Sequence, residues 1–183
     1  DETKETDSVQ DKNVADMFNS QLPQIKGAMF HVETRAAGEN SAPVTIIQSE
    51  YMRRMKELSR IESGMQFYGQ MPDEYTIILN SDHRLIKEIR EDGDKATAEK
   101  LKPVDADIKG LARRAVLSQE QEKKKADELT DEDRKQMKDC EEQIGKRREE
   151  RKGILAEYAK DNKTLHQLVD LALLQNNMLR GEA

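Results

Sequence analysis

The stretch from residue 91 to residue 160 limits most strongly what this chain can fold into. It mixes Lys, Arg, Glu and Asp densely and contains a single aromatic residue, Tyr158. Side chains so rich in charge cannot be buried on several sides at once, so this stretch cannot form the centre of a compact core. We therefore predict two amphipathic helices joined by a turn, which make an antiparallel, coiled-coil-like hairpin. The apolar positions at helical spacing are Val104, Ile108, Leu111, Ala115, Met137, Cys140, Ile144, Ile154, Leu155 and Tyr158.

The composition of the whole chain is also too polar for one large compact core. Charged residues make up 37% and hydrophobic residues 35%, whereas a typical globular domain has roughly 25% and 45–50%. The net charge is −6, so we expect neither nucleic acid nor a membrane surface as a partner. The apolar runs are too short to span a bilayer, and no secretory leader is recognisable. The polar start at Asp1, without a Met, indicates a piece of a longer protein.

Few groups of residues in the chain could carry chemistry. His31, His83 and His166 lie on separate predicted elements, with no second His or Cys at ligand spacing, so we predict no metal site. Cys140 is the single cysteine, which excludes an intramolecular disulfide and fits a reducing, cytoplasmic compartment. No common glycine-rich phosphate loop is present, and the carboxylates alternate with Lys and Arg as surface pairs do. We therefore predict no catalytic site.

Residues 1–90 contain period-two strands and capped helices after a polar lead-in over residues 1–13. We predict strands over residues 29–34, 44–47 and 75–79. We predict helices over residues 14–25 and 49–59, the second with Ser49 as its N-cap, and a short helix capped by residues 80–82 that ends at Ile89. The fold class is therefore α+β: a small three-stranded sheet with helices, then the charged hairpin and a C-terminal helix. The predicted parts are residues 1–26 (lead-in and first helix), 27–90 (α+β core), 91–160 (hairpin insertion) and 161–183 (late helix).

The late helix is apolar on nearly all sides. One face carries Leu165, Leu168, Val169, Ala172 and Leu179, and a second face carries Leu171, Leu174 and Met178. A helix of this kind must be covered on more than one side. Two interpretations stand from the residues alone: a central core helix, or a helix covered by a partner chain.

Methionine is concentrated in the first half of the chain. The methionines there are Met17, Met29, Met52, Met55, Met65 and Met71. On the helix at residues 49–59, Tyr51, Met55 and Leu58 share one face. Methionine is over-used where a surface accepts partners of varied shape. The alternative, which periodicity alone favours, is that these side chains fill the small core.

Several strings, in their order along the chain, resemble the C-terminal domain of the heat shock protein 90 (HtpG) family. They are APVTII at residues 42–47, EYMRRMKEL at 50–58, YTIILNSDH at 75–83, LVDLALL at 168–174 and MLRGEA at 178–183. Ser81 stands where the family has a proline. The string GMQFYG at residues 64–69 and the long charged insertion are similar to bacterial members of the Bacteroidetes type. The resemblance covers roughly residues 27–90 and 161–183, and matches the insertion weakly.

The resemblance implies an ATP-dependent chaperone that assists protein folding under stress, with its ATP and Mg²⁺ site in an N-terminal domain absent here. This fragment is then not an enzyme and holds no cofactor. The implied partners are unfolded or partly folded client proteins and a second copy of the chain. The implied client-binding residues are Tyr51, Met55 and Leu58 first, then Met52, Met65, Phe67 and Tyr68. The implied dimer-interface residues are Leu165, Leu168, Val169, Ala172, Leu173 and Leu179.

Two expectations qualify this function. In the family, the chain continues past the position of Ala183 into a last helix that completes a four-helix interface, so we expect a homodimer weakened by truncation. The alternative function is a structural or scaffold module that binds a partner through the charged hairpin at residues 91–160.

Overall fold

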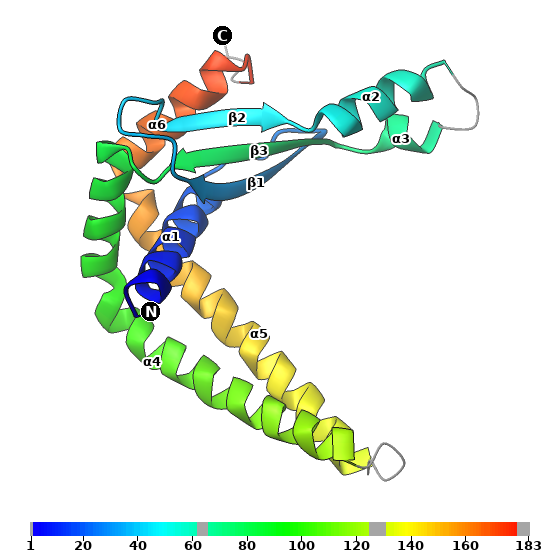
Figure 1. The fold of residues 1–183 in the computed structure, drawn as a ribbon, viewed down its shortest axis with the longest axis vertical. Helices are drawn as coiled ribbons and strands as arrows, with labels where there is room; N and C mark the ends of the chain where they lie inside the picture. Colours follow the sequence, from blue (N-terminus) through cyan, green and yellow to red (C-terminus); the bar gives the residue numbers. More distant parts are fainter. Residues whose placement is uncertain (1, 62–65, 125–130, 179–183) are drawn as a thin grey trace.

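The computed structural model describes residues 2–61, 66–124 and 131–178. It confirms the α+β class, with a small mixed sheet at one end of a long helical hairpin (Figure 1). Among the described residues, no helix combines the length and the apolar character needed to cross a membrane. The elements are α1 (Glu2–Ser20), β1 (Ala28–Arg35), β2 (Val44–Gln48), α2 (Glu50–Ser59), α3 (Gln66–Gln70), β3 (Asp73–Asn80), α4 (Arg84–Lys124), α5 (Asp131–Lys160) and α6 (Lys163–Gln175).

The sheet has the strand order β1-β3-β2, with β1 parallel and β2 antiparallel to the central strand. All three strands begin and end within two residues of their predicted bounds. Apolar and polar residues alternate in a strand that has one buried and one exposed face, so this pattern marks where such a strand lies. One face is apolar: Ile46 lies opposite Ile77, and Val44 opposite Leu79. This face packs on α1 and α6.

Helix α1 joins the sheet to the hairpin. Its side chains Val14, Met17 and Phe18 are buried, and the helix packs on β1, α4 and α5. It begins at Glu2, so the expectation of a polar lead-in over residues 1–13 is wrong. Polar residues of that part are held by neighbouring helices instead: Asp11 pairs with Arg90 at 3.0 Å.

Helix α4 differs most from expectation. It is one continuous helix of 41 residues, where the sequence predicted a short helix ending at Ile89 and a separate hairpin helix within residues 91–160. The predicted division between residues 90 and 91 therefore falls inside a helix. Pro103 lies within α4, and because proline lacks an N–H and its ring crowds the preceding turn, it bends a helix. Figure 1 shows such a bend in α4.

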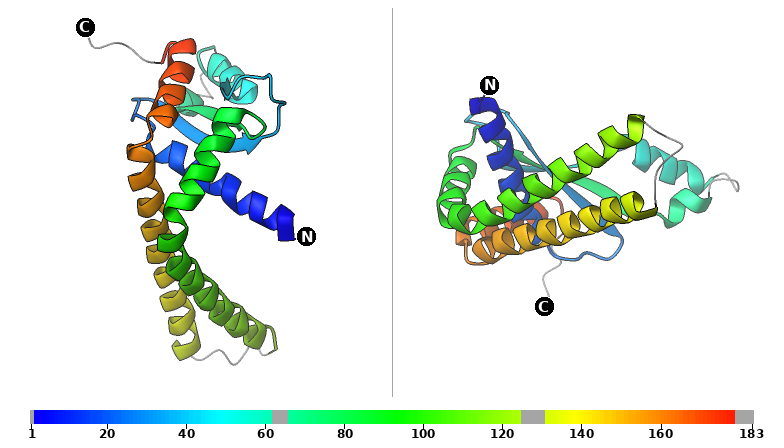
Figure 2. Two further views of the ribbon diagram at one scale, coloured as in Figure 1. Left: turned by 90° about the vertical axis from the view of Figure 1, so that its left-hand side faces the viewer. Right: turned by 90° about the horizontal axis from the view of Figure 1, so that it is seen from below.

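Helices α4 and α5 run antiparallel and side by side, as the charge pattern predicted (Figures 1 and 2). Leu101 and Leu155 place the base of this hairpin in the same core as the sheet. Further along, Arg151 pairs with Asp105 at 2.8 Å and bridges the two helices. The hairpin therefore shares its base with the core and extends as an arm on the same side of the molecule as α2 and α3 (Figure 1).

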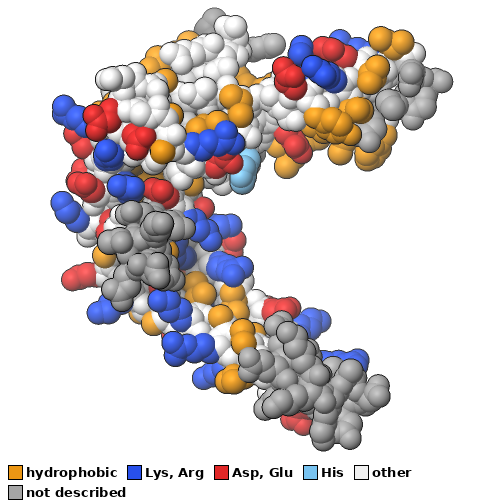
Figure 3. All heavy atoms as spheres, in the orientation of Figure 1, with side chains coloured by type: hydrophobic (Ala, Val, Ile, Leu, Met, Phe, Trp, Pro, Cys, Tyr) orange, Lys and Arg blue, Asp and Glu red, His pale blue; other side chains and the backbone are white. Residues whose placement is uncertain are grey.

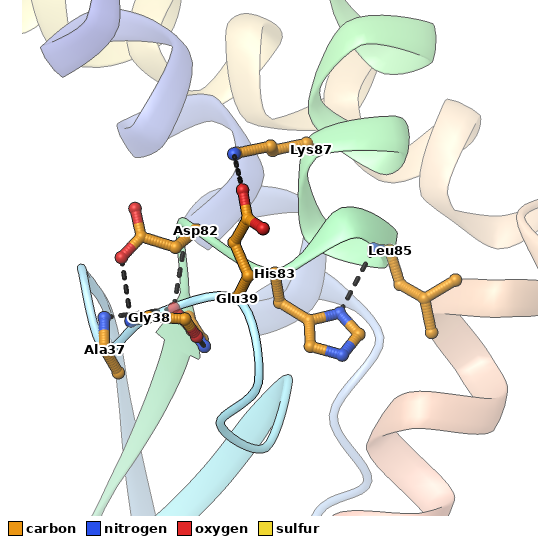
Figure 4. A network of polar contacts seen from close by, with 8 residues as sticks. Ala37, Gly38, Glu39, Asp82, His83, Leu85 and Lys87 are labelled. Atoms are coloured by element: carbon orange, nitrogen blue, oxygen red, sulfur yellow. Dashed lines mark hydrogen bonds and ion pairs between the residues drawn. The ribbon is translucent and has the colours of Figure 1, made fainter.

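A polar network fixes the sheet to the start of α4. The buried Asn80 accepts a hydrogen bond from the Ala37 N–H at 3.1 Å and donates one to the Gly38 carbonyl at 2.8 Å. The Gly38 N–H in turn donates to Asp82 at 2.8 Å, as Figure 4 shows. Gly38 has a φ of 88°, a conformation that glycine adopts without a steric cost. The loop between β1 and β2 is thereby held against the turn after β3.

Ser81, the residue that departs from the family's proline, takes part in this junction. Its backbone N–H donates to the Arg35 carbonyl at 3.0 Å. A proline at this position has no N–H and could not make the bond. The departure therefore adds a hydrogen bond between the end of β1 and the turn before α4.

The close packing of α1 on α4 gives a test of the core. A Cβ atom at Gly93 would lie 2.5 Å from Met17 Cε and 3.1 Å from Tyr158 Cε1. We expect Gly93→Leu to lower the free energy of unfolding by about 2 kcal/mol, because overpacking costs more than the gain in helix propensity. The measurement is chemical denaturation.

Gly145→Leu is the matched control, since nothing lies within 4 Å of a Cβ atom at Gly145. We expect it to raise the free energy of unfolding by about 0.5 kcal/mol through helix propensity alone. Equal effects at the two glycines would contradict the packing of α1 on α4 described above.

Candidate functional site

Helices α2 and α3 project from one end of the sheet (Figure 1). The Ser49 hydroxyl caps α2 by accepting from the Met52 N–H at 3.4 Å, the cap that the sequence predicted. Ser59 is the one buried residue of α2, and its hydroxyl donates to the Lys56 carbonyl at 2.7 Å. The helix is thus ordered by its caps and by α3 rather than by burial in the core.

The apolar side chains of this projection remain in contact with solvent. The exposed fractions are 61% for Tyr51, 39% for Leu58 and 70% for Phe67. Met52 and Met55 are half-buried and lie outside the core cluster, so the alternative in which they fill the core is wrong for α2. Figure 3 shows hydrophobic side chains gathered on α2 and α3, on the side that faces the arm.

Two further predicted residues cannot be placed. Met65 and the side chain of Tyr68 lie outside the part of the chain that the structure describes.

Sequence reasoning missed one residue of this surface. Ile61 has an exposed fraction of 81% and follows Arg60, the C-cap of α2. It was overlooked because its neighbours in the sequence are charged and it follows the predicted end of the helix at residue 59. The signal was present: Ile61 follows Leu58 at three-residue spacing, which continues the same helical face. We define the α2–α3 surface as Tyr51, Met52, Met55, Leu58, Ile61 and Phe67.

An ion pair fixes the direction in which α2 projects. Lys56 Nζ lies 2.7 Å from Asp73 Oδ1 at the start of β3, and Gln48 Nε2 donates to the same oxygen at 3.4 Å. Burial raises the pKa of the nearby Tyr75 hydroxyl, and the Asp73 carboxylate raises it further while Lys56 lowers it. By contrast, Arg54 pairs with Glu50 inside α2, and so holds nothing outside the helix.

The late helix α6 corrects a predicted interface. Its N-cap is Asn162, whose side chain accepts from the Leu165 N–H at 3.0 Å. The predicted dimer face packs instead on the core of the same chain, with 0–7% of each side chain exposed; Leu179 lies outside the described residues. The buried members of that face are Leu165, Leu168, Val169, Ala172 and Leu173.

The second apolar face of α6 is the one that remains partly exposed. Leu171 is 52% exposed and Leu174 58% exposed. The sequence could not rank the two faces, because which one meets the sheet depends on how the chain returns after α5.

Within residues 2–61, 66–124 and 131–178, no group of three or more His, Cys, Asp or Glu side chains lies close enough to hold a metal ion. Cys140 is half-buried on α5. What the described surface offers is apolar side chains on a projecting helix pair.

The sequence of the chain is similar to those of curated bacterial chaperones. The chain is 44% identical over 167 residues to the chaperone protein HtpG of Bacteroides fragilis and to that of Bacteroides thetaiotaomicron. It is 33% identical over 168 residues to the chaperone protein HtpG of Porphyromonas gingivalis. Each match covers 91% of this chain. The chain belongs to the HtpG family.

The match also includes most of the arm, since 91% of the chain is aligned. The chain spans about a quarter of the length of the HtpG proteins it matches, 24% for Bacteroides fragilis and 25% for Porphyromonas gingivalis. No protein-family profile matches the chain, and no solved structure matches it. The resemblance recognised in the sequence is thus confirmed at the level of the HtpG family.

The Lys56–Asp73 ion pair gives a test of how α2 is held. We expect Lys56→Met to speed amide hydrogen exchange in α2 about fivefold, because removing a partly buried pair costs about 1 kcal/mol of local stability. Amides of α4 in the same sample are the internal reference. The matched control is Arg54→Met, which removes an exposed pair within the helix and should change exchange by less than about twofold. The same acceleration in both variants would rule out the ion pair as the anchor of α2.

Proposed function

We propose that this segment of an HtpG-family chaperone binds unfolded or partly folded proteins through the α2–α3 surface. The observation that carries the proposal is the exposure of Tyr51, Leu58, Ile61 and Phe67 on one projecting helix pair. Exposed apolar side chains gathered in this way are unfavourable in water unless a partner covers them, and they mark interaction sites.

The residue types suit partners of varied sequence. Met52 and Met55 have flexible, polarizable side chains that adapt their shape to different apolar groups. Arg53 and Arg54 pair with glutamates of the same helix, at 3.5 Å and 3.3 Å, so the rim of the surface is polar without presenting one dominant charge. A surface of this kind selects apolar segments rather than a sequence.

ATP-dependence belongs to the same proposal. ATP and Mg²⁺ would bind a part of the protein outside this chain, and this segment would contribute no catalytic residue. Its role would be to present the α2–α3 surface while the nucleotide cycle proceeds elsewhere.

The α2–α3 surface is tested with the triple variant Tyr51→Ser, Leu58→Ser and Ile61→Ser. The probe is reduced, carbamidomethylated lysozyme with a fluorescent label, followed by anisotropy at about 0.3 M salt, where the Debye length is roughly 6 Å and charge effects are screened. We expect binding at least about tenfold weaker than that of the unchanged chain, equivalent to about 1.4 kcal/mol.

The control changes three exposed apolar residues elsewhere: Val9→Ser, Met29→Ser and Ile47→Ser, which are 48%, 56% and 41% exposed. We expect its affinity to stay within about twofold of the unchanged chain. Equal affinity of all three proteins would show that α2 and α3 do not carry client binding.

We further propose that two copies of the chain associate through the exposed face of α6, formed by Leu171 and Leu174. The support is their 52% and 58% exposure on a helix that is otherwise packed in the core. An isologous contact would place the same face of each copy against the other.

This association is tested by light scattering over a range of concentrations. We expect the double variant Leu171→Glu and Leu174→Glu to stay monomeric at concentrations where the unchanged chain gains mass, because two carboxylates per copy cannot be buried unpaired. Leu168→Glu should instead unfold the chain, since Leu168 is in the core. If the Leu168→Glu chain stays folded but no longer forms dimers, the dimer interface is instead the face of Leu168, as the family resemblance implied.

A further inference from the structure

The outer face of α4 carries a row of cations. Lys95, Lys102 and Lys109 recur at heptad spacing, and Arg113 follows one turn later. Heptad spacing brings a side chain back to nearly the same side after two turns, so all four lie on one face of the helix. All four are exposed, and the row follows the helix for about 27 Å at 1.5 Å per residue, through the bend at Pro103. We define these four residues as the basic stripe.

None of the four stripe cations has an ion pair with another described residue. Two acidic residues of α4 form ion pairs across the hairpin. Asp105 pairs with Arg151 at 2.8 Å and Asp107 with Arg147 at 3.2 Å, which joins α4 to α5. The carboxylates of Asp105 and Asp107 therefore face α5, whereas Glu91, Asp92 and Glu99, which have no ion pair with another described residue, remain exposed beside Lys95 and Lys102.

The basic stripe ends in an apolar spot. Val116 and Leu117 follow Arg113 after one helical turn and are 51% and 60% exposed. Between the cations lie the small, exposed residues Ala98 and Ala106, which leave room for another backbone to approach. Figure 3 shows basic side chains over α4 on the outer side of the arm.

We propose that the basic stripe binds an acidic, amphipathic helix of a partner protein. Such a helix repeats every two turns over about 10.5 Å, the same spacing as the lysines of the stripe. Its carboxylates at heptad spacing would pair with Lys95, Lys102 and Lys109, and one carboxylate a single turn further on would pair with Arg113. An apolar side chain at its end would cover Val116 and Leu117. Opposite charges set the register, and the apolar contact adds affinity.

Other anionic partners fit this face less well. The whole chain has a net charge of −6, and Glu91, Asp92 and Glu99 flank or interrupt the stripe. An unbroken row of phosphates would meet these carboxylates and be repelled, whereas a helix can place uncharged side chains opposite them. A membrane surface requires a broad apolar face beside the cations, whereas the apolar part here is two residues at one end.

The basic stripe is independent of the α2–α3 surface, since it lies on a different helix and recognises charge rather than apolar segments. Partner binding through the hairpin is the alternative function predicted from the sequence. The basic stripe defines the chemistry that such a partner would have.

The probe for the test is a fluorescent helical peptide of about 25 residues, with Glu at the heptad positions that match the stripe and Leu at one end. It is made in both chain directions, and a second version has Gln in place of every Glu. We expect the Glu peptide to bind in at least one direction, binding to weaken as salt is raised, and the Gln peptide to bind at least about tenfold more weakly.

The stripe variant is Lys102→Glu, Lys109→Glu and Arg113→Glu, and the matched control is Arg134→Glu, Lys138→Glu and Arg148→Glu on α5. These control residues are also exposed and give the same change in net charge. We expect the stripe variant to lose at least about tenfold in affinity and the control less than about threefold, since nonspecific attraction alone depends on net charge. Circular dichroism is used to check that both variants are folded. The double variant Val116→Ser and Leu117→Ser should bind the Glu peptide severalfold more weakly than the unchanged chain.

Three results would overturn the proposal: equal losses in the stripe variant and the control, no loss in either, or tighter binding of single-stranded DNA or phosphatidylserine vesicles than of the Glu peptide. The α2 triple variant should bind the Glu peptide normally, so the proposal can fail without affecting the client-binding proposal.

Discussion

The rest of the structure depends on how Met17 and Phe18 of α1 pack between the sheet and the two long helices. These side chains are 1% and 0% exposed, and α1 lies against the sheet and against both helices of the arm. Gly93 permits the close approach of α4 to Met17. With that contact in place, a chain of 37% charged residues needs only one small core, from which α2–α3 and the arm can extend into solvent.

Two projections with different chemistry follow from this arrangement. The α2–α3 surface presents flexible apolar side chains and suits unfolded segments, whereas the basic stripe of α4 presents cations at regular spacing and suits an acidic helix. Both lie outside the core, so their residues are free of the packing constraints that fix Phe18 or Leu155. Membership of the HtpG family gives the first projection its proposed context.

The sequence was sufficient wherever a local pattern determined the outcome. Alternation located the three strands, Ser49 located the start of α2, and the charge pattern located the hairpin, because each is set by neighbouring residues. It failed where tertiary contacts decide: α4 continues through Pro103, and α6 turns Leu168 and its neighbours towards the sheet and Leu174 towards solvent. Of the predicted client-binding residues, exposure was correctly expected for Tyr51, Leu58 and Phe67, and Ile61 was missed.

The central claim is that unfolded proteins contact the α2–α3 surface, and site-specific photo-crosslinking tests it most directly. A photoreactive phenylalanine derivative is placed at Tyr51 in one chain and at Arg148, an exposed position on α5, in another. After illumination with an unfolded protein, we predict crosslinks from position 51 that an excess of unlabelled unfolded protein suppresses, and few from position 148. Crosslinks of equal yield from both positions, or from position 148 alone, would contradict the account.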